Sequence, residues 1–490
     1  MNGNDDRFSY AADPKASSTG KQYILGDEIV TITPRNNPTE FAWGQTYEFP
    51  VDDVPFLISK KNHLLITYKI EAKGSGKTLW EKYKVASDYS QFIPVENFGS
   101  AFIEEVGMRQ GLDPMDTDGF VPRGRYLYEN FLMAHTSRKV RQQYAISKRD
   151  PALFCYQNEN VLVPTKKEFY TAFGKGDAYE PGDDPPADCA FTTPTTMCVV
   201  PHAFPFQYRN RSTMHDVLFP NSGNPLTITI KLHSSYRHLF SLSSAATSQF
   251  RIVVQDIKLV LATPRLSQEG YDLIRNRSLR PLRYEGHFVK QYAQVVSANP
   301  NEINLVLQKI PMPQYMLIQM YKQEYFTGTT VSDFKYDDRP CKPLPFKIKT
   351  ARLRFGNRDL SYQTANFDVE KQGSDVLRQE ILKNSDVFGC SEMDQEYYQP
   401  ETDSEIAAYQ HAHYLFSFCS DEKNQTILRP MDYVDRKDVP DNLSMTLISQ
   451  SNFPNGKMLI SLIYTKAGIE YSVRAGTFAE RDLNSLLLVS

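Results

Sequence analysis

The residues closest to a catalytic motif are Gly74-Ser75-Gly76-Lys77-Thr78. A Gly-Lys-Thr run after a strand ends a phosphate-binding loop, in which the lysine and backbone amides hold the phosphates of a nucleotide. The full motif needs a glycine five residues before Gly76, and Glu71 occupies that position. A carboxylate there would repel phosphate, and the residues after Thr78 are a weak start for the helix that the motif requires. The sequence therefore predicts a surface turn, and a nucleotide-dependent assembly factor is the weakest functional hypothesis.

His411 and His413 place two imidazoles on one face of a predicted strand, a spacing that metal sites use. Third and fourth ligands would have to come from the acidic loop at 394–405. A hydrogen-bonded or partly exposed pair of histidines is the simpler interpretation. We therefore predict no metal site.

Two pairs of adjacent carboxylates, Asp52-Asp53 and Asp183-Asp184, lie in proline-rich turns. Nothing beside them would raise one pKa, so neither pair is arranged for acid and base catalysis. The sequence also has no Gly-x-Ser-x-Gly motif, and its cysteines show neither paired nor zinc-like spacing. The cysteines, expected to be reduced thiols, lie at positions 155, 189, 198, 341, 390 and 419. We predict no catalytic residue, no cofactor and no enzymatic activity.

The stretch from Arg123 to Arg149 is basic and contains tyrosines, so it could contact nucleic acid or an acidic partner. The whole chain, however, has 55 basic and 58 acidic residues and a net charge of −3, unlike proteins that coat nucleic acid by charge. The favoured interpretation is a solvated helix face at a subunit contact, with no specific nucleic-acid binding. The basic residues are Arg123, Arg125, Arg138, Lys139, Arg141, Lys148 and Arg149.

The composition predicts the elements that surround these residues. The 490 residues include 29 Tyr, 29 Phe and 30 Pro but only 2 Trp, which is typical of an all-β chain with many loops. Residues 1–22 are small and polar and are expected to form a flexible arm. The sequence shows no signal peptide and no apolar stretch of membrane-spanning length.

The central stretch Gln249–Phe288 is interpreted as a seam between two β-rich halves. The strand Phe250–Leu261 is expected to stop at Thr263-Pro264, because proline cannot donate to a ladder. A short helix is predicted within 266–276, with Ser267 as its N-cap. Strand pattern resumes at Tyr284–Val289, and strand pairings are expected to stay on their own side of the seam.

Each half is predicted to hold several strands, one helix and one long loop. Asn455-Gly456 between apolar runs predicts a hairpin, and Lys466-Ala467-Gly468 predicts a second turn. The predicted strands lie at 45–51, 63–70, 226–232, 303–307, 315–321, 346–355, 414–418 and around 443–447. The segment 92–108 is predicted to hold either two short strands or one strand and a turn. The predicted helices are Arg125–Tyr144 and Ser374–Leu382, and the predicted loops are 165–197 and 384–410, the second with an acidic part at 391–405.

Several segments resemble one family. QTYEFPVDDVPFLISKKNHLLITYKI (45–70), FIPVENFGSAFIEEVGMR (92–109), and GRYLYENFLMAHTSRKVRQQY (124–144) with KRDPALF resemble the opening of the double jelly-roll major capsid proteins of Polinton (Maverick) elements and adintovirus-like DNA viruses. FRIVVQDIKLVLATPRLS (250–267) resembles the strand that closes their first jelly roll. PNEINLVLQKIPMPQYMLIQMYKQEYFTG (300–328) resembles the opening of the second. The chain departs from the pattern at Arg109-Gln110-Gly111, where an Asn-Gly turn is expected.

The resemblance implies an all-β fold of two consecutive eight-stranded jelly rolls, with a few inserted helices and long loops. The corresponding segments are an arm (1–22), a first jelly roll (23–264), a linker with a short helix (265–283) and a second jelly roll (284–490). An alternative to the capsid interpretation is a carbohydrate-binding or carbohydrate-active β-sandwich protein. Such a protein needs paired carboxylates or an exposed aromatic platform.

The function implied by the resemblance is that of a major capsid protein. Three copies would form a pseudo-hexagonal capsomer, and capsomers would tile the faces of an icosahedral shell around double-stranded DNA. The implied partners are the chain itself, a vertex (penton) protein and minor capsid proteins. The implied location is the virion, after synthesis in the host cytoplasm, with the nucleus left open as the site of assembly.

Overall fold

The structure is a computed structural model, which describes part of the chain. The described residues are 24–36, 38–51, 56–58, 62–73, 78–79, 81–82, 92–95, 98–110, 113–117, 119–134, 155–158, 161–164, 195–199, 217–219, 226–242, 249–270, 282–313, 315–327, 343–359, 413–417, 440–472 and 477–480.

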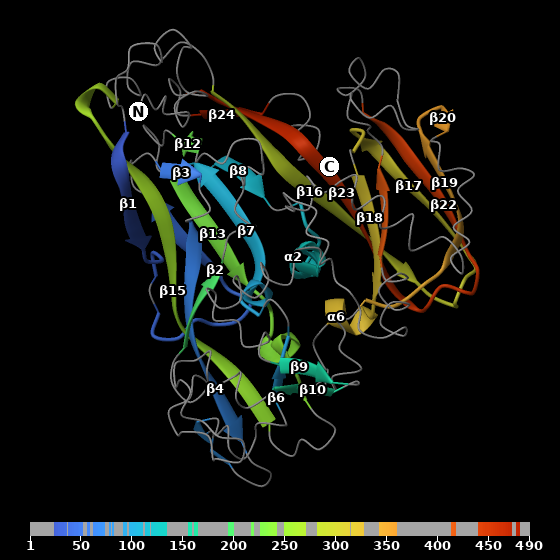
Figure 1. Cartoon of the computed structure of the whole chain (residues 1–490), viewed down its shortest axis with the longest axis horizontal. Helices are drawn as coiled ribbons and strands as arrows, with labels where there is room; N and C mark the ends of the chain where they lie inside the picture. The colour runs from blue at the N-terminus through green and yellow to red at the C-terminus, as the bar shows by residue number, and fades with distance from the viewer. Residues whose placement is uncertain are drawn as a thin grey trace.

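Strands dominate both halves of the chain (Figure 1). The strands of the first half are β1 (Ile24–Ile32), β2 (Thr46–Val51), β3 (Phe56–Ile58), β4 (His63–Lys73), β5 (Glu81–Lys82), β6 (Phe92–Pro94), β7 (Ile103–Gln110), β8 (Asp113–Thr117), β9 (Cys155–Asn158), β10 (Val161–Pro164), β11 (Thr195–Val199), β12 (Val217–Phe219), β13 (Leu226–Leu232), β14 (Phe240–Leu242) and β15 (Gln249–Leu266). Its helices are η3 (Ser100–Phe102), α2 (Gly124–Ala134) and η6 (Tyr236–Leu239).

The main strands of the first half form two sheets in the orders β1-β15-β4-β11 and β2-β13-β7-β8, and β5 adds to β4. Numbered along the chain, the eight main strands lie as first, eighth, third and sixth in one sheet and as second, seventh, fourth and fifth in the other. This order follows from winding a long antiparallel hairpin into two Greek keys, and it defines a jelly roll. The short pairs β3-β12, β6-β14 and β9-β10 are additions to it.

The second half repeats this topology. Its main sheets have the orders β16-β23-β18-β21 and β17-β22-β19-β20, which again read first, eighth, third, sixth and second, seventh, fourth, fifth. The elements are β16 (Leu282–Val296), β17 (Glu302–Ile310), β18 (Tyr315–Tyr321), α6 (Gln323–Thr327), β19 (Ile348–Phe355), β20 (Arg358–Asp359), β21 (His413–Ser417), β22 (Asp441–Ser449), β23 (Gly456–Ser472) and β24 (Thr477–Glu480), which pairs with β23.

Alternating side chains form a core inside each barrel. In the first barrel, Leu64 and Ile66 of β4 pair with Leu259 and Ile257 of β15, and all four side chains are buried. In the second barrel, Met316, Ile318 and Met320 of β18 pack with Met458, Ile460 and Leu462 of β23. Burial of these apolar side chains supplies the main favourable free energy of each barrel. The predicted all-β fold with two consecutive jelly rolls is confirmed.

The described strand pairings all stay on one side of the seam, as expected. The predicted helix start is also correct, since residues 268–270 are helical and the Gly270 amide donates to the Ser267 hydroxyl oxygen at 3.1 Å. The rest of the predicted helix lies outside the described residues. The predicted strand end was wrong, because β15 continues through Pro264 to Leu266. Pairing with β4 ends at Val260, so Pro264 has only β1 beside it, and its missing N–H is tolerated as on an edge strand.

The predicted hairpin at Asn455-Gly456 was also wrong. This segment connects β22 to β23, and these strands belong to different sheets of the second barrel. The chain crosses there because β22 must pair with β17 while β23 pairs with β16. The turn predicted at Lys466-Ala467-Gly468 is instead part of β23, which absorbs the irregularity as a bulge opposite Gly286 and Phe288.

The predicted helix Arg125–Tyr144 is observed as α2 over Gly124–Ala134, and the residues after it lie outside the described part. Strand β1 and helix α6 were not predicted. The predicted arm at 1–22, helix Ser374–Leu382, acidic loop 391–405, loop 384–410 and most of loop 165–197 also lie outside it. Among the described residues, no helix is long and apolar enough to cross a membrane.

Candidate functional site

The possible phosphate-binding segment connects two antiparallel strands. Residues Gly74–Lys77 lie outside the described part, but the strands on either side pair as Glu71 with Lys82 and Ala72 with Glu81. A phosphate-binding loop requires a helix after the glycines, and a strand follows here.

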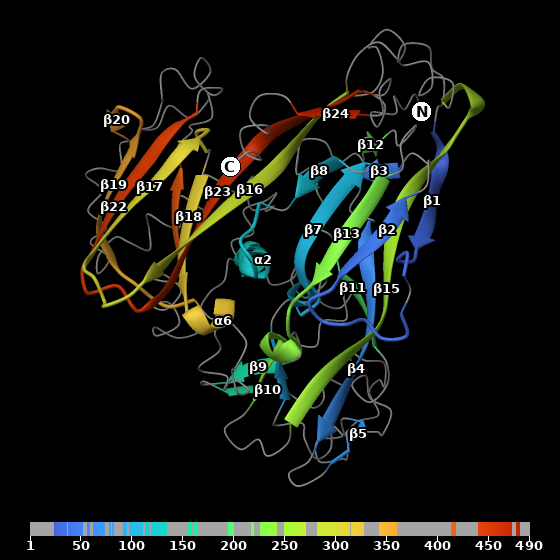
Figure 2. The ribbon, with the colours of Figure 1, turned by 180° about the vertical axis from the view of Figure 1, so that it is seen from behind.

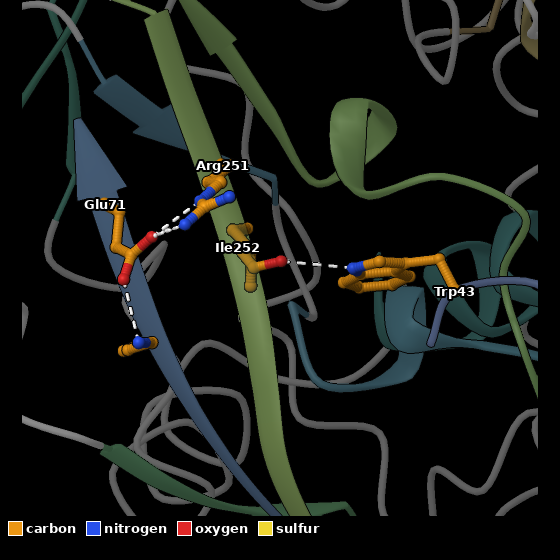
Figure 3. A network of polar contacts seen from close by, with 5 residues as sticks. Trp43, Glu71, Arg251 and Ile252 are labelled. Atoms are coloured by element: carbon orange, nitrogen blue, oxygen red, sulfur yellow. Dashed lines mark hydrogen bonds and ion pairs between the residues drawn. The ribbon is translucent and has the colours of Figure 1, made fainter. Parts of the chain in front are cut away.

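Glu71 is part of an ion-pair network on the sheet surface (Figure 3). Its carboxylate lies 2.8 Å from Lys69 Nζ and accepts from Arg251 Nε at 2.6 Å. Burial alone would raise the pKa of Glu71, but the hydrogen bonds and charges of Lys69 and Arg251 outweigh it, so the pKa lies below its ordinary value. The ionised carboxylate of Glu71 therefore connects β4 to Arg251 of β15.

The other predicted chemical groups do not assemble into a site within the described residues. His413 begins β21 and pairs with Gln319, while His411, both aspartate pairs and the acidic loop lie outside the described part. Among the described residues, no group of three or more His, Cys, Asp or Glu side chains could hold a metal. Trp43 does not offer an open platform to a sugar, because its ring stacks on Phe102 with the ring centroids 5.5 Å apart. Its Nε1 also donates to the Ile252 carbonyl at 3.1 Å (Figure 3).

The prediction of a solvated basic face was wrong for the two arginines that the structure describes. Arg123 is 8% exposed and Arg125 is 2% exposed. Arg125 pairs with Glu129 at 3.2 Å inside the helix α2. Buried arginines cannot contact nucleic acid, and Arg123 instead contacts the second barrel.

Arg123 and Tyr325 bind each other across the boundary between the barrels. The Arg123 Nη1 donates to the Tyr325 carbonyl at 2.5 Å, and the Tyr325 hydroxyl donates to the Arg123 carbonyl at 3.2 Å. The second guanidinium nitrogen, Nη2, donates to the Ser234 hydroxyl. Arg123 takes a left-handed conformation with φ of 67°, which turns its side chain and carbonyl toward α6. Burial lowers the pKa of Arg123, and Tyr325 and Glu104 oppose this effect.

Gln291 makes a second set of contacts across the boundary. Its backbone N–H donates to the Gly119 carbonyl at 2.7 Å. Its side-chain Nε2 donates to the Gly124 carbonyl at 3.3 Å and to Ser461 Oγ at 3.0 Å. Gln291 and Ser461 are register partners in β16 and β23, so their polar side chains meet on the outer face of the second barrel. Gly124 begins α2, which lies between β7 and β16 in both views (Figures 1 and 2).

A pair of buried histidines lies behind Arg123. The rings of His233 and His238 stack at 3.4 Å, and the His238 Nε2 lies 2.7 Å from the Ala101 carbonyl. Burial lowers the pKa of His238 to about 3, with Arg123 adding to the effect. Burial also lowers the pKa of His233 well below its ordinary value, and the positive charges of Arg123 and Lys231 act in the same direction. Both rings are therefore neutral near pH 7, which allows them to stack beside a guanidinium.

We call the contacts of Arg123, Gly124, Gln291, Tyr325 and Ser461 the inter-barrel junction. It consists of hydrogen bonds between groups of the two barrels, and these contacts connect one barrel to the other. Sequence reasoning assigned Arg123 to the surface and did not identify Gln291 or Tyr325. Their partners are 167 to 202 residues away in the sequence, so local spacing carried no signal for them.

Known structures resemble this arrangement over nearly its whole length. A chain in the cryo-electron microscopy structure of the Sputnik virophage gives a TM-score of 0.54 at 12% identity, covering 96% of this chain and 92% of that chain. The mavirus major capsid protein, in a crystal structure, gives 0.50 at 10% identity, covering 94% and 92%. The fold of this chain is the double jelly roll. No protein-family model and no curated protein sequence matches the chain.

In a double jelly roll, the inter-barrel junction limits how the two barrels can move relative to each other. Each barrel closes its own core, so the covalent seam alone would leave the barrels free to rotate. The hydrogen bonds of the junction oppose such a rotation between the described parts of the two barrels.

Proposed function

We propose that this chain is a major capsid protein that acts by self-assembly and has no catalytic activity. Three copies form a pseudo-hexagonal capsomer, and capsomers tile the faces of an icosahedral shell around double-stranded DNA. We also propose that the chain is encoded by a virus or by an integrated element of the Polinton (Maverick) kind.

The observation that carries the proposal is the repeat of one strand order in two barrels joined by a buried junction. Because each chain has two barrels with the same strand order, three copies side by side would present six similar barrels. Six similar barrels suit a tile with a hexagonal outline. The likeness to the mavirus major capsid protein, which covers more than nine tenths of both chains, supports the same function.

We further propose the segment boundaries and partners that this function implies. The segments are an arm at 1–22, a first jelly roll at 23–264, a linker at 265–283 and a second jelly roll at 284–490. The partners are the chain itself, a vertex (penton) protein and minor capsid proteins, in a virion assembled in the cytoplasm or nucleus of a host cell.

Light scattering coupled to size-exclusion chromatography, followed by negative-stain microscopy of the purified chain, tests the proposal. We expect a particle with three times the mass of one chain and a hexagonal outline. A monomer at all concentrations and ionic strengths that instead binds glycans would overturn the proposal.

A further inference from the structure

The buried histidine pair lies where the first barrel meets helix α6 of the second barrel. His233 directly follows β13, and His238 belongs to η6. Their rings face Tyr325 of α6, whose ring centroid is 6.3 Å from that of His233 and 6.4 Å from that of His238. Both views show α6 on the side of the second barrel that faces the first (Figures 1 and 2). Because Tyr325 is itself buried, α6 helps to keep water from the histidine rings.

His233 is poorly satisfied for so deeply buried a polar group. Neither of its ring nitrogens has a hydrogen-bond partner among the described residues, whereas the Nε2 of His238 lies 2.7 Å from the Ala101 carbonyl. A neutral imidazole has one N–H donor and one acceptor nitrogen, and leaving them without partners costs free energy. Water would relieve this cost if α6 moved away.

Positive charge predominates among the ionisable groups that face the pair. Burial is the largest cause that lowers the pKa of His233, and the charges of Arg123, before α2, and of Lys231, in β13, act in the same direction. The acidic group is Glu104 of β7, which lies 3.5 Å from the Lys231 ammonium. The remaining charged residues of η6 and α6 are exposed, namely Arg237 and Glu324. A proton added to either ring would therefore increase an excess of positive charge beside Arg123.

We propose that the His233–His238 pair is an acid-sensitive switch of the inter-barrel junction, which opens the junction at low pH while both barrels stay folded. The switch concerns contacts within one chain, so it does not rest on the proposed function. In a capsomer of the proposed kind, acid would change the orientation of one barrel relative to the other. That consequence alone rests on the proposed function.

The contacts of Arg123 connect the histidines to the rest of the junction. The guanidinium that would face the new positive charge is the group that binds the Tyr325 carbonyl. Arg123 is followed in the chain by Gly124, whose carbonyl accepts from Gln291, so the two sets of contacts should separate together. The core of the second barrel is formed mainly by side chains of its strands, so release of α6 leaves that core in place.

The size of the effect follows from His238. Burial lowers the pKa of His238 to about 3, whereas its ordinary value, expected once water reaches the ring, is 6.5. Between about pH 7.5 and pH 5, the ratio of open to closed junction should rise about thirty-fold, because the open form gains the proton. His233, whose pKa burial lowers in the same direction, should add to the rise.

Residue-resolved hydrogen exchange of the full-length protein measures this opening. The Gln291 N–H donates to the Gly119 carbonyl across the boundary, so its protection reports on the junction. Successive N–H groups of a strand point to opposite sides, so the Lys290 N–H points toward β23 and reports on the barrel. We expect the protection factor of Gln291, corrected for the intrinsic exchange rate, to fall by about thirty-fold or more from about pH 7.5 to pH 5. The protection factor of Lys290 should fall by less than about threefold.

Three variants separate the switch from a merely structural contact. His238→Gln removes the titratable ring and keeps an N–H that can donate to the Ala101 carbonyl, so the fall at Gln291 should be about thirty-fold smaller. His63→Gln is the matched control, because it makes the same change at a half-buried histidine of β4, and it should behave like the wild type. Tyr325→Phe removes the hydroxyl that donates to the Arg123 carbonyl. It should lower the protection of Gln291 at both pH values and leave the pH-dependent ratio unchanged.

Other outcomes overturn the inference in distinguishable ways. If Gln291 and Lys290 lose protection together, acid unfolds the second barrel as a whole. If Gln291 keeps its protection at pH 5, the junction does not respond to the histidines. If His238→Gln shows the same fall as the wild type, another group is responsible. If circular dichroism shows that His238→Gln does not fold, the comparison of Gln291 with Lys290 in the wild type and in Tyr325→Phe decides the question.

Discussion

The substitution Gly124→Ala tests whether the inter-barrel junction is as closely packed as its contacts indicate. A Cβ atom added at Gly124 would lie 2.0 Å from Gln291 Oε1 and 2.7 Å from Val121 Cγ2. Real Cβ atoms do not approach other atoms so closely, so Gln291 must move. Its movement would break the bonds that Nε2 donates to the Gly124 carbonyl and to Ser461 Oγ.

The magnitude follows from these contacts. Overpacking costs about 1 to 3 kcal/mol, and each of the two lost hydrogen bonds costs about 1 kcal/mol. Alanine is a better helix former than glycine, which returns up to about 1 kcal/mol at the start of α2. We therefore expect Gly124→Ala to lower the free energy of unfolding by about 2 to 4 kcal/mol.

Equilibrium urea unfolding, followed by circular dichroism and fluorescence, measures the effect. Gly26→Ala is the matched control, because a Cβ atom there meets no atom within 4 Å, and it should change stability by less than about 0.5 kcal/mol. A double variant with Gln291→Ala removes the main clash, so it should be more stable than Gly124→Ala alone. A Gly124→Ala variant as stable as the wild type, or a double variant with strictly additive losses, would refute the packing argument.

Three further predictions concern buried polar groups. The pKa values of His233 and His238 are depressed in the folded state, so below about pH 6.5 the unfolded chain binds protons that the folded chain does not, and stability should fall as the pH is lowered. His238, whose pKa is lowered to about 3, should alone account for a loss of about 2 kcal/mol between pH 6.5 and 5, and His233 should add to it in the same direction. Urea unfolding at both pH values measures this loss, and His238→Gln should show a smaller one. Glu71→Gln should lower the free energy of unfolding by about 1 kcal/mol at pH 7. Because the pKa of Glu71 is depressed, this loss should become smaller as the pH falls through the range in which carboxylates are protonated. Magnesium-ATP should leave the Tm of the wild type unchanged, because the chain lacks a complete phosphate-binding motif. Gln319 is fully buried, and neither atom of its side-chain amide has a hydrogen-bond partner among the described residues. Gln319→Met should therefore raise the free energy of unfolding, measured in urea, by about 1 kcal/mol. A lower free energy of unfolding would show that this side-chain amide has hydrogen-bond partners in the folded protein.

Local patterns predicted individual elements well. The alternation of Leu64, Ile66 and Tyr68 identified β4, and all three side chains are buried in the first barrel. Ser267 was identified as a helix N-cap because its hydroxyl can accept from an amide three residues later, and it does so. Such features depend on a few neighbouring residues, and the sequence contains all of them.

The errors arose where a neighbour distant in the sequence decided the outcome. Asn455-Gly456 has the composition of a hairpin, but the pairing needs of β22 and β23 in different sheets direct the chain across the barrel. Pro264 should end a strand, but it lies where β15 has a neighbour on only one side. Arg123 belongs to a basic, surface-like sequence, yet Tyr325 and Ser234 bury it.

The sequence by itself determined that this chain is all-β, where many strands lie, and that no complete phosphate-binding motif is present. The resemblance of several segments to a known family implied two jelly rolls, whereas the tertiary structure alone decided which strands pair and how the barrels are joined. The physical reason is that alternation states which side chains of a strand avoid water, whereas a backbone ladder accepts almost any strand as a partner. The partner is chosen by packing between residues up to about 200 positions apart, such as Gln291 and Gly124 or Arg123 and Tyr325.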